Sequence, residues 1–218
     1  MKLFNLTDSN HGLLNLALRR IKVSRVADLN DPFELLPVNV RNKDLRAALR
    51  HNRDEFNRKR GILCFSPSWS SPVMWAHYGD KHKGMALGFE IPDHLVAQVN
   101  YSATLLDFDV SAISDPTRAE DETKKLFVTK YSGWSYEDER RVFVDLAECE
   151  EEGGLHFAPF SKDIRLEEVV IGERSSASVK RVKELVSSYP HPIRVRKARC
   201  AFTKYGVTEN RYRVASKR

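Results

Sequence analysis

The stretch GILCFSPSWSSPVMWAHYGDKHKGMALGFEI, residues 61–91, organises the predicted fold of this chain. Residues 62–65 form a compact apolar run, the length of a buried strand and too short for a helix. This run ends at Pro67, because proline removes a backbone donor and turns the chain. Residues 85–89 form a second apolar run and predict a second buried strand. A short aromatic-rich helix or turn is expected between the two.

Polar and aromatic side chains gather between these two strands. They include Ser66, Trp69, Trp75, His77 and Tyr78. Aromatic rings with polar tips beside hydroxyl groups are typical of a pocket wall, where His77 could also hydrogen-bond a ligand. The same pattern fits a corner of the hydrophobic core with a buried, hydrogen-bonded His77. The pattern alone favours this second interpretation.

Length and composition predict one globular domain spanning residues 1–218. The chain is 41% hydrophobic and 30% charged, which is ordinary for a soluble protein with a sizeable core. No apolar run is long enough to cross a bilayer, and the first residues lack the apolar region of a signal peptide. Cys64, Cys149 and Cys200 lie far apart and form no CxxC pair. We therefore expect reduced thiols in a cytoplasmic protein without a membrane partner.

Basic residues are unevenly distributed along the chain. The net charge is +6, and residues 191–218 hold nine Lys and Arg against one acid, Glu209. A second basic segment spans residues 41–60. Segregated positive charge attracts polyanions such as RNA or DNA. The candidate nucleic-acid-binding residues are Arg194, Arg196, Lys197 and Arg199. A solvated basic surface is the alternative interpretation, and charge alone favours it.

The order of predicted elements favours an α+β fold, because strands and helices do not alternate regularly. Strands are expected near residues 2–6, 21–24, 105–108, 142–146, 169–172 and 193–205. Helices are expected after residues 7–10 and near residues 43–59, 94–98, 116–131 and 179–186. Asn30, Asp31 and Pro32 predict a rigid turn, since Asx side chains bond to nearby backbone and proline restricts its neighbour.

Residues 134–141, WSYEDERR, form the sharpest polar cluster in the sequence. If this segment opens a strand, Glu137 and Glu139 project to the same face. A carboxylate at the edge of a strand can hold a sugar hydroxyl and stabilise a developing oxocarbenium ion. A surface network of Glu and Arg fits the same pattern, which alone favours it.

Several familiar catalytic and metal-binding motifs are absent from the sequence. We find no phosphate-binding GxxxxGK[ST] loop, no GxGxxG, no GxSxG and no HExxH. The seven histidines are scattered, so no metal site is expected. Any catalysis is therefore expected to be acid–base or electrostatic.

The chain resembles a bacterial family catalogued as a domain of unknown function, across nearly its whole length. The motifs that carry the resemblance are NDPFE (30–34), CFS (64–66), MWAHYG (74–79), KGMALGF (83–89), W-x-Y-E-x-E-R (134–140) with Lys130 before it, and VVIG (169–172). That family looks like a distant branch of the ADP-ribosyltransferase fold, with some members linked to toxin–antitoxin or phage-defence loci. One departure is Phe4-Asn5, where the family usually has Tyr-Lys. The first-strand catalytic position is therefore left unassigned.

The resemblance implies mainly antiparallel sheets around a cleft that binds NAD, with flanking helices. Ser66 would contact the nicotinamide ribose, and Trp75 or Tyr78 would stack on the nicotinamide ring. Glu139, or Glu137 in a shifted register, would hold the ribose hydroxyl and stabilise the oxocarbenium ion. Asn30 and Asp31 would organise the mouth of the cleft. These roles predict that Ser66, Tyr78 and Glu139 line one cleft.

The sequence therefore predicts an NAD-dependent ADP-ribosyltransferase, a toxin-like or anti-phage effector that modifies a nucleic acid or a protein. An antitoxin protein is a further expected partner. The alternative is a nucleic-acid-binding module, in which the aromatics are stacking platforms and the basic C-terminal segment is an electrostatic groove. A metal-independent nuclease using His77 and Glu139 is a third hypothesis, which the sequence supports only weakly.

Overall fold

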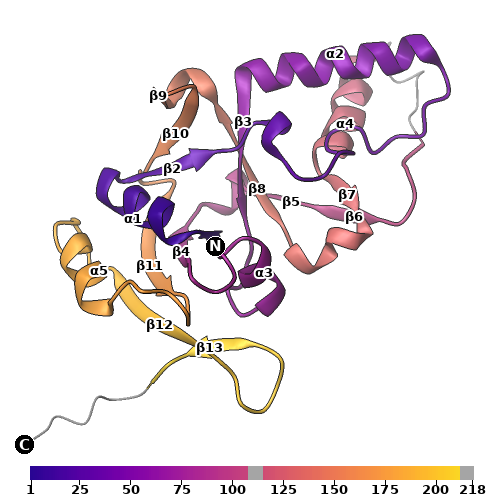
Figure 1. Ribbon diagram of the computed structural model, residues 1–218. Helices are drawn as coiled ribbons and strands as arrows, with labels where there is room; N and C mark the ends of the chain where they lie inside the picture. The colour runs from indigo at the N-terminus through magenta and orange to yellow at the C-terminus, as the bar shows by residue number, and fades with distance from the viewer. Residues whose placement is uncertain (108–114, 212–218) are drawn as a thin grey trace, which may run out of the picture. The chain divides into compact units, whose positions relative to one another are not determined.

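The computed structural model describes residues 1–107 and 115–211, and it divides into two compact units (Figure 1). The first unit comprises Met1–Arg20, Ser66–Ile91 and Phe160–Arg218, and the second comprises Ile21–Phe65 and Pro92–Pro159. The chain therefore passes between the units four times, and no single cut in the sequence separates them.

The first unit is built on a five-stranded sheet. In order across the sheet, its strands are β1 (Lys2–Thr7), β4 (Met85–Glu90), β11 (Arg165–Ile171), β12 (Arg194–Cys200) and β13 (Val207–Glu209). The β11–β12 pair is parallel, and the other neighbouring pairs are antiparallel. Its helices are α1 (Ser9–Leu18), α3 (Pro72–His77) and α5 (Val179–Val186). Helix α1 packs against α5 (Figure 1).

Strand β4 lies inside this sheet, between β1 and β11, and its sequence explains why. Met85, Ala86, Leu87 and Phe89 are fully buried, and Gly88 is also buried. A continuous apolar run suits a strand that is covered on both faces. On one edge β4 pairs with β1 and on the other with β11. The buried strand predicted at residues 85–89 is confirmed.

Capping residues explain where the helices of the first unit begin. The Asp8 carboxylate accepts hydrogen bonds from the backbone N–H groups of Asn10 and His11 at the start of α1. The Ser71 and Ser178 hydroxyls accept from the first turns of α3 and α5. Each side chain satisfies donors that the first turn of a helix leaves unpaired.

Gly84 lies at a close approach between two backbone segments, just before β4. A methyl group at this position would come within 2.0 Å of the Thr7 carbonyl oxygen and 2.9 Å of the Gly79 carbonyl oxygen. The Gly84 N–H donates to that same Gly79 oxygen at 2.8 Å. Both obstacles are backbone atoms, so a side chain cannot displace them by changing rotamer.

We therefore expect Gly84→Ala to lower the free energy of unfolding by about 1–3 kcal/mol, the usual cost of overpacking. Gly206→Ala is the matched control, because the nearest atom to its added methyl group lies at 3.8 Å. The control should stay within about 0.5 kcal/mol of the parent protein. Urea unfolding of both variants gives the comparison. Equal stabilities would show that the backbone at Gly84 is not closely packed.

The second unit contains three small sheets. Their strand orders are β2 (Arg20–Val23)–β10 (Leu155–Pro159)–β9 (Glu150–Glu152), β3 (Arg60–Phe65)–β8 (Arg140–Asp145)–β5 (Ala97–Gln98), and the pair β6 (Asn100–Ser102)–β7 (Thr129–Tyr131). The longer helices are α2 (Lys43–Lys59) and α4 (Pro116–Phe127). Short 3₁₀ turns are η1 (Val26–Asp28), η2 (Asp93–Leu95), η4 (Ser132–Glu137) and η5 (Leu146–Glu148).

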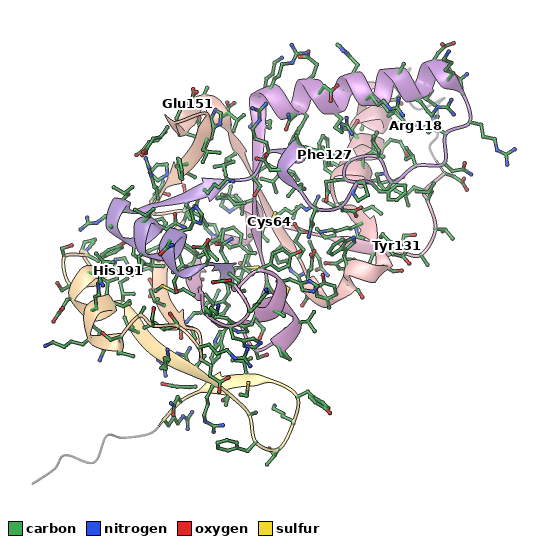
Figure 2. All side chains as sticks on the ribbon, viewed as in Figure 1. Cys64, Arg118, Phe127, Tyr131, Glu151 and His191 are labelled. Carbon is green, nitrogen blue, oxygen red and sulfur yellow. The ribbon has the colours of Figure 1, made fainter. Side chains whose placement is uncertain are left out.

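Aromatic packing joins the helices of the second unit to its strands. The rings of Phe56 on α2, Phe127 on α4 and Phe143 on β8 lie within 4.5–6.0 Å of one another, centre to centre. They pack against a core that includes Ile62, and Cys64 of β3 joins the same cluster (Figure 2). Contacts of this geometry add to the hydrophobic gain from burial.

The α+β class with mainly antiparallel sheets is confirmed, and three local predictions differ from the structure. Residues 94–98 are not a helix, because η2 ends at Leu95 and β5 follows. The helix expected to reach residue 131 ends at Phe127, and β7 follows it. The long basic strand at 193–205 is instead the hairpin β12–β13. Phe108, in the strand expected at 105–108, lies outside the described residues.

Within residues 1–107 and 115–211, no helix combines the length and apolar character that a membrane span requires.

Candidate functional site

Five buried charged side chains lie together in the second unit. They are Glu34, Lys130, Glu137, Glu139 and Arg141, and we refer to them as the ion cluster. Each of these side chains is 5% exposed or less. They come from separate segments: the turn at residues 30–34, β7, the loop that includes the end of η4, and β8.

Arg141 is the first positive centre of the ion cluster. Its Nε and Nη2 donate to the two carboxylate oxygens of Glu139, at 3.0 and 3.1 Å. Its Nη1 donates to Glu34 Oε1 at 2.6 Å and to the Phe127 carbonyl oxygen at 2.8 Å. One guanidinium group thus joins β8, the 30–34 turn and the end of α4. Paired, planar contacts of this kind are geometrically specific.

Lys130 forms the second positive centre of the cluster. Its Nζ donates to Glu137 Oε2 at 2.6 Å and to Glu139 Oε2 at 3.3 Å. The ammonium group also lies 4.9 Å from the centre of the Trp134 ring. Both oxygens of Glu139 therefore have cationic partners. The backbone N–H of Glu139 donates to the Tyr101 hydroxyl at 2.8 Å, which fixes the segment before β8.

The prediction that Glu137 and Glu139 project to the same face required them to lie in a strand. The segment that carries them is not a strand. Glu137 ends the 3₁₀ turn η4, and Asp138 adopts a left-handed conformation with φ of 44°. Strand β8 begins only at Arg140. The two carboxylates nevertheless meet at Lys130. They converge because the turn reverses the chain, and strand alternation has no part in it.

The environment moves the pKa values of two cluster carboxyls in opposite directions. Burial raises the pKa of Glu34, and the nearby Arg141 charge offsets only part of that effect. Burial alone would also raise the pKa of Glu139, but Arg141 and Lys130 outweigh it, so the pKa of Glu139 is lowered. The pKa of Lys130 is raised despite its burial, because of Glu139 and Glu137. Opposed pKa shifts favour different roles for the two carboxyls, Glu34 as a group that can carry a proton and Glu139 as a carboxylate that stays ionised.

Burial is the main cause of the raised pKa of Glu34, and the negative charge of Glu139 adds to it. Three carboxylates face two cations, so one proton makes the group neutral. Arg141 binds Glu139 through two nitrogens and Glu34 through one. Glu139 therefore keeps the negative charge. Ionised Glu139 stabilises the folded protein above pH 4.5, its ordinary pKa, and this contribution is lost as the pH falls from 4.5 through the lowered pKa of the folded state. Ionised Glu34 destabilises the folded protein above its raised pKa, and this cost disappears as the pH falls through that pKa.

Two cavities of the second unit adjoin the ion cluster. One, of about 200 Å³, is lined by Asp31 and Glu34 together with Leu29, Arg53 and Asn57. Glu34 Oε2 and Asp31 Oδ2 are buried without a hydrogen-bond partner among the described residues. A second cavity, of about 260 Å³, is lined by Lys130, Phe33, Thr129 and Tyr131. Buried polar atoms without partners are uncommon and often mark a functional site.

The other predicted residues of the 30–34 turn differ in their exposure. Asp31 is buried, and its Oδ1 accepts a hydrogen bond from the Phe33 N–H at 2.9 Å, so the predicted rigid turn is confirmed. Asn30 is exposed. Asp31 therefore both shapes the turn and lines the smaller cavity, whereas Asn30 lies on the surface beside it.

The predicted residues of the 61–91 stretch belong to the first unit from Ser66 onward, and Glu139 belongs to the second. Ser66 is buried and exchanges backbone hydrogen bonds with Phe4, both at 2.8 Å. It thus extends the ladder of the first strand. The cleft predicted to join Ser66, Tyr78 and Glu139 stays a prediction.

Trp75 has the environment of a core residue. It is fully buried, its Nε1 donates to the Trp69 carbonyl oxygen at 2.6 Å, and its ring stacks on His82. Its ring surface is therefore not accessible to a ligand in this conformation. Tyr78 is partly exposed. His77 is exposed, so the interpretation of His77 as a buried histidine is wrong.

The basic residues predicted to bind nucleic acid lie on β12, and most are engaged within the first unit. Arg194 pairs with Glu209 at 3.3 Å. Arg196 pairs with the buried Glu168 and lies 5.3 Å from the Trp69 ring centre. Lys197 donates to the Ser175 carbonyl oxygen at 2.8 Å, and burial lowers its pKa. Arg199 lies over the Phe202 ring at 4.3 Å.

Three residues that a metal ion could bind also approach one another in the first unit. His82, Glu173 and Cys200 bring their ligand atoms within 4.8 Å of one another. Glu173 and Cys200 are exposed, and the Cys200 thiol donates to Glu173 at 2.9 Å. That hydrogen bond is enough to explain the contact, so we treat the group as an arrangement of surface residues.

Sequence reasoning did not assign a functional role to Glu34, Lys130 or Arg141. Glu34 and Lys130 both lie in the motifs that carry the family resemblance, NDPFE and the segment that begins at Lys130. Arg141 directly follows the last of those motifs. The family motifs therefore pointed to Glu34 and Lys130, but nothing in the sequence indicated that they lie close to Glu139.

Comparisons of the chain with protein-family models, with curated proteins and with solved structures find no match. The geometry of the described residues is therefore the basis for assigning a function.

Removing the central cation should destabilise the protein strongly. We expect Arg141→Met to lower the free energy of unfolding by about 3–5 kcal/mol, because it leaves Glu139 buried without its main partner. Adding Glu139→Gln to this variant should restore part of the loss. Urea unfolding of the two single variants and the double variant gives the coupling energy between the residues.

Arg60→Met is the matched control, since Arg60 pairs with Asp145 at 3.8 Å in a half-exposed position. Its effect should be about 1 kcal/mol or less. If Arg141→Met is as mild as this control, the ion cluster does not hold the second unit together.

Proposed function

We propose that this protein is an NAD-dependent ADP-ribosyltransferase whose reactive centre is the ion cluster. The observation that carries the proposal is the pairing of Glu34, with a raised pKa, and Glu139, with a lowered pKa, on one guanidinium group. Enzymes that cleave glycosidic bonds usually use two carboxyl groups whose pKa values are shifted in opposite directions. Replacing a whole buried ion cluster by apolar residues often costs little stability, although removing one of its members costs much, so a chemical role gives a reason for keeping this one.

The transferred group comes from the bond between the nicotinamide nitrogen and C1 of the ribose. When this bond breaks, its electron pair leaves with nicotinamide, and positive charge develops on C1 and the ring oxygen. A lone pair of the acceptor then bonds to C1, and the acceptor releases one proton. The reaction as written requires no oxidant, reductant or metal ion.

The geometry assigns different roles to the two carboxyls. Both oxygens of Glu139 are held by cations, so it acts through its fixed negative charge, which stabilises the developing positive charge on the ribose. Glu34 lines the smaller cavity, and its Oε2 is buried without a hydrogen-bond partner among the described residues. In this proposal Glu34 contacts the substrate once Oε2 is uncovered, as a hydrogen-bond donor when protonated. Glu137 holds Lys130 in place.

The two cavities suit one end of a dinucleotide. Each is smaller than the roughly 300–1,000 Å³ of a typical site for a drug-sized ligand, so each accommodates a ring or a ribose and not a whole NAD molecule. Phe33 and Tyr131, both more than half exposed, supply aromatic surface to the larger cavity. Thr129 and Lys130 supply polar groups beside them.

The activity can be measured with NAD labelled separately in the nicotinamide ring and in the adenylate phosphate. Incubation with total RNA, DNA or a cell lysate should release labelled nicotinamide and transfer the adenylate label to an acceptor. Glu34→Gln and Glu139→Gln should each lower the rate by about 100-fold or more, the usual effect of removing one electrostatic contact to a transition state. Glu34→Gln keeps the size of the side chain and an oxygen that can accept from Arg141, so we expect it to fold.

Glu151→Gln is the control, because Glu151 is an exposed carboxylate on β9 of the same unit (Figure 2). Its rate should equal that of the parent protein. The proposal fails if the parent protein consumes no NAD with any of these acceptors. It also fails if Glu34→Gln and Glu139→Gln remain folded by circular dichroism and turn over NAD at the parent rate.

A further inference from the structure

The hairpin that joins β12 to β13 exposes two aromatic rings. Phe202 is 80% exposed and Tyr205 is completely exposed. Exposed aromatic rings that lie close together can form an apolar patch, and such patches mark interaction sites more often than single exposed residues do. The two rings are three residues apart, in the six-residue turn from Ala201 to Gly206.

Backbone hydrogen bonds anchor this turn at its base. The Ala201 N–H donates to the Gly206 carbonyl oxygen at 2.8 Å, and the Val207 N–H donates to the Ser70 carbonyl oxygen at 2.8 Å. Val207 itself is buried. The rings thus project from an anchored turn, so they lose less freedom on binding than rings on a free chain end would.

Positive charge surrounds the two rings. Lys204 lies between them in sequence and is exposed, and the Arg199 guanidinium stacks on the Phe202 ring at 4.3 Å. The first unit as a whole carries 20 Lys and Arg against 9 Asp and Glu, a net charge of +11. The second unit has 16 against 21, a net charge of −5. The excess positive charge of the protein therefore belongs to the unit that presents the rings.

We propose that the Ala201–Gly206 turn binds single-stranded nucleic acid, with Phe202 and Tyr205 stacking on bases and Lys204 contacting phosphate. Stacking on exposed rings beside a basic groove is how proteins bind single strands with little sequence preference. A duplex hides the faces of its bases, so it offers these rings nothing to stack on. Arg196 and Lys197, which the sequence predicted to bind nucleic acid, stabilise the first unit instead, because their side chains contact Glu168 and the Ser175 carbonyl oxygen. This inference does not depend on the proposed transferase activity.

Fluorescence anisotropy of the full chain, with labelled single strands of RNA and of DNA about 16 nucleotides long, tests the proposal. Phe202→Ala and Tyr205→Ala should each weaken binding by at least about fivefold, the effect of losing one stacked base. Both residues are exposed, so neither substitution should affect folding. Leu14→Ala, which removes an exposed apolar side chain of α1, is the control and should leave binding unchanged.

The contribution of Lys204 is tested through salt dependence. Lys204→Gln should reduce the slope of log affinity against log salt by about 0.7, as expected for one phosphate contact to a single strand. Lys180→Gln, which neutralises an exposed lysine on α5, should leave the slope unchanged. The RNA and DNA strands show which nucleic acid is preferred, and tight binding of either one supports the proposal.

Two outcomes would overturn it. One is duplex binding as tight as single-strand binding, with no effect of Phe202→Ala or Tyr205→Ala. The other is binding of poly-glutamate as tight as that of the oligonucleotides, which would mean that the surface recognises acidic protein segments or negative charge alone.

Discussion

The contact of the Arg141 guanidinium with Glu139 and Glu34 is the interaction on which the second unit depends. A fully buried cation is expensive unless its donors are matched, and here Glu139, Glu34 and the Phe127 carbonyl oxygen accept hydrogen bonds from its three nitrogens. The same contacts bring β8, the 30–34 turn and α4 together, so local geometry and chemistry are coupled. Burial raises the pKa of Glu34, Arg141 offsets only part of that effect, and Glu34 Oε2 is left without a hydrogen-bond partner among the described residues.

The two units differ in charge as well as in structure. The second unit, which carries the ion cluster and its cavities, has a net charge of −5, whereas the first has +11. The first unit presents the aromatic hairpin at the edge of a sheet in which the apolar residues of β4 are buried. The proposed chemistry and the proposed nucleic-acid contact thus belong to different parts of the protein, and substitutions can separate them.

Much of the fold was predictable from local signals, whereas the candidate site was not. The apolar runs at β3 and β4 and the capping residues of α1 and α5 identify their elements without tertiary information. The role of Arg141 depends on Glu34, which is 107 residues away in sequence. The left-handed Asp138 likewise brings Glu137 and Glu139 to one lysine by a turn that a strand pattern does not predict. Contacts over such distances come from tertiary packing, which no local pattern contains.

The central claim is that one ion cluster keeps Glu139 ionised and favours protonation of Glu34. NMR titration of the glutamate carboxyl carbons tests it most directly, with Glu34→Gln and Glu139→Gln used to assign the two signals. We predict that Glu34 titrates above the ordinary value of 4.5 and Glu139 below it. Titration of both carboxyls at the ordinary value, or in the reverse order, would contradict the account.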